Sequence, residues 1–103
     1  MAKGDTPVLD ALADINAVSL ERTELNPESL VLVRLAALIA VDAPVSSYLL
    51  HMGPAAQAGV TIDQAQDVLV GVAPIVGTPR TAAAAAKIAE ALDMAIILAE
   101  PDA

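Results

Sequence analysis

The chain has 103 residues, enough for one domain, and 56% of them are hydrophobic, against roughly 45–50% in ordinary soluble domains. A domain of this size buries only about two-thirds of its unfolded surface, so a monomer would expose much of this apolar content. We therefore expect self-association to complete the core. The formal net charge of −8 disfavours nucleic acid and anionic membrane surfaces as partners, because such binding depends on clustered Lys and Arg.

The cysteine and histidine content limits the chemistry that the chain can perform. The sequence has no cysteine and one histidine, so disulfides and thiolate nucleophiles are excluded, and a zinc or iron site would lack its usual ligands. We expect neither a metal nor a cofactor. The apolar stretch from Leu30 to Val41 is interrupted by Arg34 and is too short to cross a membrane. The N-terminus lacks the apolar stretch and cleavage site of a secretory signal, so a cytoplasmic location is expected.

Helix start and stop signals predict about five helices in a single all-α domain over residues 1–103, and no segment shows the alternation of a strand. The first helix is expected from about Pro7 to Leu20, with Thr6 as its cap. Its apolar face comprises Val8, Leu12, Ile15 and Val18. The second helix is predicted to begin after Asn26, which is a favourable capping residue. Because this helix is apolar all round apart from Arg34, we expect it to be buried.

The second half of the chain contains three further predicted helices. One follows Asp42-Ala-Pro44 and is expected to stop at Gly53-Pro54, leaving residues 55–58 as a separate turn. The next begins at Thr61, which has the capping-box spacing to Gln64. Pro74 is expected to kink or end that helix, because proline removes a backbone N–H and clashes with the preceding turn. The last helix is predicted from Thr78-Pro79 to about residue 99.

A family layout is visible over about half of the chain. The apolar helix LVLVRLAALIAV leads into a short segment that ends in His51, and AAQAGVTIDQAQDVLVGVAPIVGTPR follows. The matching positions are Ala55, Gly59, Thr61, Gln64, Asp67, Val68, Leu69, Gly77, Pro79 and Arg80. This layout, from Leu30 to Arg80, resembles the carboxymuconolactone decarboxylase and alkyl hydroperoxidase D-like family. The resemblance implies a helical subunit that assembles into a homotrimer or hexamer with sites near the interfaces.

The sequence departs from the peroxidase members of that family at their catalytic motif, C-x-x-C-x-x-x-H with an upstream glutamate. Counting back from His51, the two cysteine positions hold Pro44 and Ser47, and the glutamate position holds Leu32. A serine hydroxyl has a far higher pKa than a thiol and forms no disulfide. Dithiol peroxidase activity is therefore not expected, and whether the chain is an enzyme at all is left open.

The decarboxylase members do not use the cysteine pair, and their reaction calls for proton transfer and for a carboxylate anchor. His51 and Arg34 are the matching groups here. Histidine exchanges a proton near neutral pH, although a lone histidine at a helix end is more often a capping or packed residue. An arginine inside an apolar helix needs a partner. We favour an acidic side chain such as Asp67, Asp63 or Asp42, from the same subunit or a neighbouring one, as that partner over a substrate carboxylate.

Two weaker candidates lie beside the histidine. Ser47 is four residues before His51, so the two side chains can share one helix face as a nucleophile–base pair, but no orienting carboxylate is evident. Tyr48 can donate a hydrogen bond in a pocket, although a lone tyrosine between leucines is usually a core residue. Arg80 is expected on the surface, in the first turn of the last helix.

Two functional hypotheses remain. One is a thiol-independent enzyme or binding protein for a small carboxylate or lactone, with a lyase- or isomerase-like reaction if it is catalytic. The other is a non-catalytic helical assembly that keeps the family fold without its chemistry.

Overall fold

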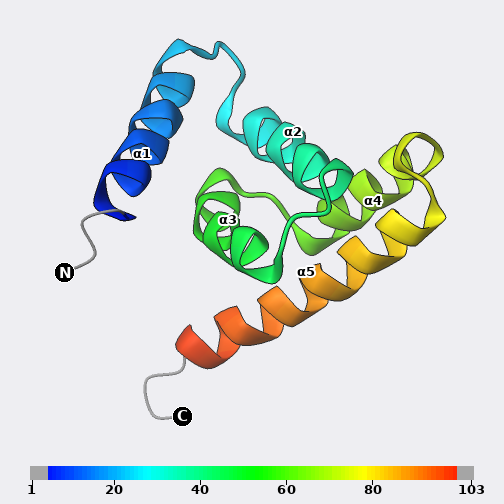
Figure 1. Cartoon of the computed structure of the whole chain (residues 1–103). Helices are drawn as coiled ribbons and strands as arrows, with labels where there is room; N and C mark the ends of the chain where they lie inside the picture. Colours follow the sequence, from blue (N-terminus) through cyan, green and yellow to red (C-terminus); the bar gives the residue numbers. More distant parts are fainter. Residues whose placement is uncertain (1–4, 100–103) are drawn as a thin grey trace.

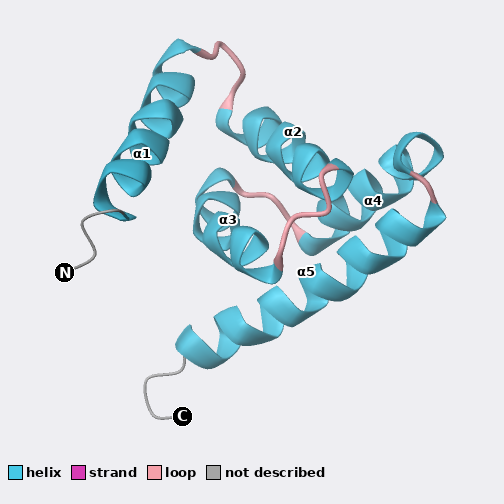
Figure 2. Ribbon diagram, viewed as in Figure 1, coloured by secondary structure: helices cyan, strands magenta, loops and turns pink. Residues whose placement is uncertain are grey.

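The computed structural model describes residues 5–99 and contains five helices and no strand over that range (Figures 1 and 2). The helices are α1 (Asp5–Arg22), α2 (Pro27–Ala40), α3 (Val45–Ala58), α4 (Ile62–Val76) and α5 (Thr78–Ala99). The all-α prediction is confirmed. None of the described helices is both long enough and apolar enough to span a lipid bilayer.

Local capping fixes several of the predicted boundaries. The Asn26 side chain accepts a hydrogen bond from the Ser29 N–H at 2.8 Å and begins α2. At the start of α4, Thr61 accepts from the Gln64 N–H at 3.1 Å, and the Gln64 side chain accepts from the Thr61 N–H at 2.9 Å. The predicted capping box is therefore confirmed. The last helix also begins and ends as predicted.

The two internal prolines do not end their helices. α3 continues through Gly53 and Pro54 to Ala58, so the stop predicted there is wrong. At Pro74, where a kink or an end was predicted, α4 continues to Val76, so an end at Pro74 is wrong and the kink stays a prediction. Each proline removes one backbone hydrogen bond but is itself exposed to solvent. The helices end at residues with positive φ, Gly59 at 78° and Gly77 at 93°, conformations that glycine adopts without strain.

Helices α2 to α5 form a four-helix body. α2 packs on α3, α4 and α5, and α5 packs on α3 and α4. The buried centre consists of Ile39, Ala43, Tyr48, Ala84 and Ala91. The small alanines let α5 approach its neighbours closely, as the alanine-rich sequence suggests. α3 and α4 each pack on α2 and α5 but not on each other, so an opening is left between them.

The helix α1 stands apart from this body and packs on none of the other described helices (Figure 1). Its predicted apolar face is exposed: Val8 by 57%, Leu12 by 56%, Ile15 by 66% and Val18 by 47%. The helix also starts at least two residues earlier than predicted, so Thr6 and Pro7 lie inside its first turn.

α2 is less buried than its uniformly apolar sequence predicts. Ile39 is fully buried, whereas Val33 is 54% exposed, because one side of α2 has no helix of this subunit against it. Two polar contacts attach its C-terminal end to α5. Lys87 Nζ lies 2.9 Å from Asp42 Oδ1, and Arg80 donates a 2.8 Å hydrogen bond to the carbonyl oxygen of Ala40. Arg80 is exposed in the first turn of α5, as predicted, but it also satisfies a free C-terminal carbonyl of α2.

Candidate functional site

A hollow of about 320 Å³ lies between α1 and the body and contains both predicted polar groups. Arg34 comes from α2 and His51 from α3. The remaining lining consists of Leu12, Ile15, Asn16 and Ser19 from α1, with Ala37 and Leu38 from α2. The hollow thus combines one cation, one imidazole, two neutral polar groups and an apolar wall. We call it the Arg34 hollow.

Arg34 has neutral hydrogen-bond partners. Its Nη1 donates to Asn16 Oδ1 at 2.7 Å, and its Nη2 donates to Ser19 Oγ at 3.0 Å. Within the described part of one subunit, Arg34 thus does not form the expected pair with an acidic side chain, and Asp42 pairs with Lys87 instead. A pair with an acid of a neighbouring subunit stays a prediction. A guanidinium has five N–H donors, so donors remain for a bound anion.

The two α1 partners were not identified from the sequence. Asn16 and Ser19 are three residues apart and therefore share a helix face, and this polar pair in a helix rich in apolar residues was the available signal. Neither residue type indicates a charged partner, because Asn and Ser in helices commonly bond to their own backbone or to water. Their role depends on the position of α1 beside α2.

His51 lies inside α3 and not at its end, because that helix continues to Ala58. The Nδ1 atom of His51 lies 2.7 Å from the carbonyl oxygen of Ser47. A carbonyl oxygen can only accept, so Nδ1 carries the hydrogen and the neutral ring keeps a lone pair on Nε2. The bond uses the Ser47 backbone and not its hydroxyl, so this geometry does not form the nucleophile–base pair that the spacing allowed.

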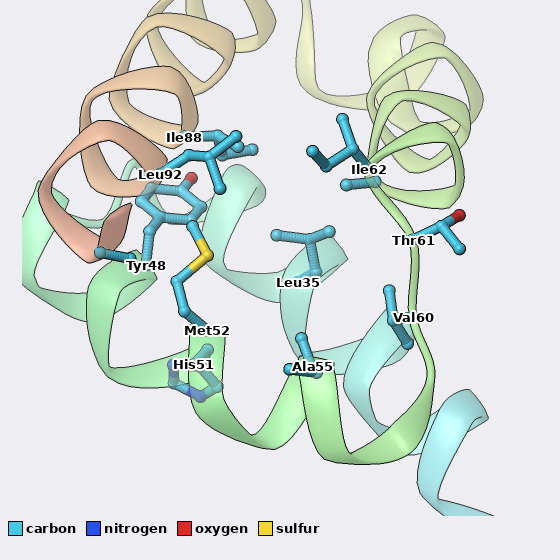
Figure 3. Close-up of a pocket in the computed structure, with 13 residues that line it drawn as sticks. Leu35, Tyr48, His51, Met52, Ala55, Val60, Thr61, Ile62, Ile88 and Leu92 are labelled. Atoms are coloured by element: carbon cyan, nitrogen blue, oxygen red, sulfur yellow. The ribbon is translucent and has the colours of Figure 1, made fainter. Parts of the chain in front are cut away.

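A second cavity, also of about 320 Å³, occupies the opening between α3 and α4 (Figure 3). Its walls include Leu35 of α2, Tyr48 and Met52 of α3, Ile62 of α4, and Ile88 and Leu92 of α5. His51 lies at its edge below Met52 in this view and lines the Arg34 hollow as well. The imidazole is therefore part of the wall between the two spaces. We call this second space the apolar cavity.

Tyr48 is 2% exposed, in line with the expected core position, but its hydroxyl has no hydrogen-bond partner among the described residues. Burial raises the pKa of the Tyr48 hydroxyl above its usual value, and the nearby negative charge of Asp42 raises it further. The side chain is therefore a neutral hydrogen-bond donor at physiological pH. Arg34 and His51 line the Arg34 hollow, whereas Tyr48 lines the apolar cavity.

Over residues 5–99, the described side chains contain no group of three histidine or acidic residues arranged to hold a metal ion. Arg34 and His51 can nevertheless bind an anion and exchange a proton without a metal.

The helical fold and the placement of its capping motifs define an all-helical subunit of the type that the sequence layout implies. A comparison with protein families matches residues 6–95 to the carboxymuconolactone decarboxylase family. The chain belongs to this family, as a member without cysteine. Comparisons with curated proteins and with solved structures found no match.

Proposed function

We propose that the Arg34 hollow binds a small organic carboxylate or a lactone acid, with Arg34 as the anchor. The observation that carries this proposal is the neutrality of the described partners of Arg34. Asn16 and Ser19 orient the guanidinium without neutralising its charge. A carboxylate that replaces or joins them would add the attraction between opposite charges and can accept two parallel N–H bonds from the guanidinium.

His51 is the proposed proton carrier in the same hollow. Its Nδ1–H bond to the Ser47 carbonyl fixes the ring, so Nε2 can accept a proton from a bound ligand and return it. General acid–base catalysis of this kind contributes roughly 10²- to 10⁴-fold to a rate. It requires no thiol, which agrees with the cysteine-free sequence and favours a lyase- or isomerase-like reaction if the protein is catalytic.

Replacing Arg34 with methionine tests the anchor. We expect Arg34→Met to raise the dissociation constants of the small mono- and dicarboxylic acids that the protein binds by about tenfold or more, since a hydrogen bond to a charged group contributes about 1.5–3 kcal/mol. Arg80→Met is the matched control because it changes the net charge equally but lies outside the hollow. It should change these constants less than twofold. Calorimetric titration with a panel of such acids, including lactone acids, measures both.

A second variant separates ligand binding from the attachment of α1. Asn16→Ala with Ser19→Ala removes both neutral partners while keeping the guanidinium, so carboxylate affinity should be kept or increased. If the panel binds equally well to the wild-type chain and to Arg34→Met, the anchor proposal is wrong. The same conclusion holds if no acid in the panel binds the wild-type chain at millimolar concentration.

The proton-transfer role has its own test. His51→Gln should keep carboxylate affinity and slow the exchange of solvent deuterium into the carbon next to the ligand carbonyl by about 100-fold or more. Proton NMR of the bound acids in D₂O follows this exchange. An undiminished exchange rate in His51→Gln would exclude the role.

The exposed face of α1 favours a second candidate function, namely homo-oligomeric assembly. The apolar residues Val8, Leu12, Ile15 and Val18 of α1 are about half or more exposed, and no other described helix packs on α1. Contiguous apolar faces of this kind usually mark interfaces. This supports the self-association that we expect from composition, with the trimer or hexamer as the form that the family resemblance implies.

Charge substitution on α1 tests the assembly. Ile15→Asp should reduce the mass measured by light scattering to that of a smaller species at micromolar concentration, because burying an unpaired carboxylate is unfavourable. Val70→Asp introduces the same charge at a 73% exposed position on α4 and should leave the mass unchanged. A wild-type chain that is monomeric at tens of micromolar would contradict the assembly proposal.

A further inference from the structure

The apolar cavity shares only His51 with the proposed carboxylate site. It exists because α3 and α4 are held apart by α2 and α5, without packing on each other. Apart from His51 at its edge, its walls carry no ionisable group other than Tyr48, which is neutral at physiological pH. A ligand held here would therefore be uncharged, because an unpaired charge in such surroundings is strongly disfavoured.

The Tyr48 hydroxyl gives this cavity a polar end. In Figure 3 the ring of Tyr48 forms one wall, and Ile88 and Leu92 of α5 line the cavity with it. A buried hydroxyl without an acceptor costs free energy, so this O–H is an unused donor in a wall that is apolar except for His51 and Thr61. The atom is fully covered, so a neighbouring side chain has to move before an acceptor can reach it.

We propose that the apolar cavity binds a neutral carbonyl compound of about eight carbons, with the Tyr48 hydroxyl donating a hydrogen bond to the carbonyl oxygen. The volume suits such a ligand: it is about twice that of an engineered cavity of roughly 150 Å³ that binds benzene, and it lies at the lower end of the range for natural ligand sites. The apolar walls hold the hydrocarbon part, and Tyr48 selects ligands with an acceptor. No carboxylate and no contact with Arg34 is involved.

The test compares two probes of the same shape in the full chain. Acetophenone carries a carbonyl oxygen where α-methylstyrene carries a methylene group. Methyl NMR spectra report on the cavity through Met52, Ile62 and Ile88, which line it, and Met94 and Ile15, which do not, are internal references. Acetophenone should shift the first group and not the second, and it should bind about threefold to tenfold more tightly than α-methylstyrene, as expected for one hydrogen bond.

Two variants identify the residues on which probe binding depends. Tyr48→Phe should remove the preference for acetophenone without weakening α-methylstyrene, and it should fold at least as stably as the wild type because it deletes an unsatisfied hydroxyl. Ala65→Leu, which places a larger side chain into the cavity, should weaken both probes. Arg34→Met should weaken neither, so this result does not depend on the fate of the carboxylate proposal.

The proposal fails if neither probe shifts the cavity methyl groups. This would also be the result if a second copy of the chain covered the cavity. It also fails if the two probes bind the wild type equally, or if Tyr48→Phe keeps the preference for acetophenone.

Discussion

α1 and α2 both carry large apolar side chains at helical spacing, yet one helix is covered and the other is not. Ile39 of α2 is fully buried, whereas Ile15 of α1 is 66% exposed. The sequences account for part of this difference, because α2 is apolar almost all round whereas α1 also carries acidic side chains. α2 has three helices of the same subunit packed against it, and α1 has none. The burial of a helix thus depends on which helices pack against it. In the assembly proposal, a second copy of the chain packs against α1.

The contacts of α1 with the body are also of a different kind. The body is held by apolar packing around Ile39, Tyr48 and the α5 alanines. By contrast, α1 is attached by the covalent link through residues 23–26 and by the hydrogen bonds from Arg34 to Asn16 and Ser19. Exposed polar contacts contribute little free energy compared with buried apolar groups. The wall that α1 gives to the Arg34 hollow is therefore expected to be the most easily displaced part of the site.

The largest expected effect on stability comes from replacing an isoleucine of the body with alanine, compared with the same replacement in α1. Ile39→Ala should lower the free energy of unfolding by about 2–5 kcal/mol, because it leaves a cavity in the packed centre. Ile15→Ala should change it by less than about 0.5 kcal/mol at concentrations where the chain is monomeric. Urea unfolding followed by circular dichroism measures both.

Protein concentration then sharpens this comparison. If α1 docks on a second copy, the cost of Ile15→Ala should rise as the wild-type chain assembles, since association stabilises the folded state by mass action. A cost that is independent of concentration would break the proposed link between α1 and assembly. Ile39→Val, with an expected cost of about 0.5–1.5 kcal/mol, replaces Ile39→Ala if the latter does not fold.

A smaller effect on stability is expected from replacing either of two asparagines, Asn16 in α1 and Asn26 directly before α2. Asn26→Ala removes the N-cap of α2 and should cost about 1 kcal/mol in unfolding of the body. Asn16→Ala removes an exposed bond to Arg34 and should cost less than half as much. Thermal unfolding of the two variants at equal concentration gives the comparison. A greater cost for Asn16→Ala would mean that α1 contributes to the stability of the body.

Those elements that depend on local chemistry were predictable from the sequence. The caps at Asn26 and Thr61 involve residues three positions apart, so their spacing identified the starts of α2 and α4. The family layout was also readable, because it rests on residues that shape turns and caps. Errors arose at Pro54, and at Pro74 for the alternative that the helix ends there, because the effect of a proline depends on whether its side of the helix faces solvent.

The candidate site was only partly predictable. Arg34 stood out as a cation in an apolar helix, and His51 as the single histidine, and the two do line one hollow. The partners of Arg34 were not predictable, because they depend on where a separate helix lies and not on charge. The apolar cavity was missed for a similar reason. The cavity arises because α3 and α4 do not pack on each other. No spacing of residues along the sequence predicts this.

The smallest expected effect concerns the ion pair that joins the end of α2 to α5. The Lys87 ammonium, through its hydrogen bond and its charge, holds the pKa of Asp42 below its usual value. A carboxyl with a lowered folded-state pKa stabilises the fold above the unfolded-state pKa of about 3.9, and that stabilisation is lost as the pH falls through the folded-state value.

Lys87→Met should therefore reduce stability slightly at pH 7 and flatten its decline below about pH 4. The measurement is the difference in unfolding midpoint between the variant and the wild type from pH 7 to pH 2, with Glu90→Gln on the exposed side of α5 as a control for charge. Because the pair belongs to the body, the difference should persist in Ile15→Asp, where assembly through α1 is blocked. If the pH effect disappears in Ile15→Asp, Asp42 and Lys87 lie at an interface between copies. The stability of the body would then depend on assembly through α1.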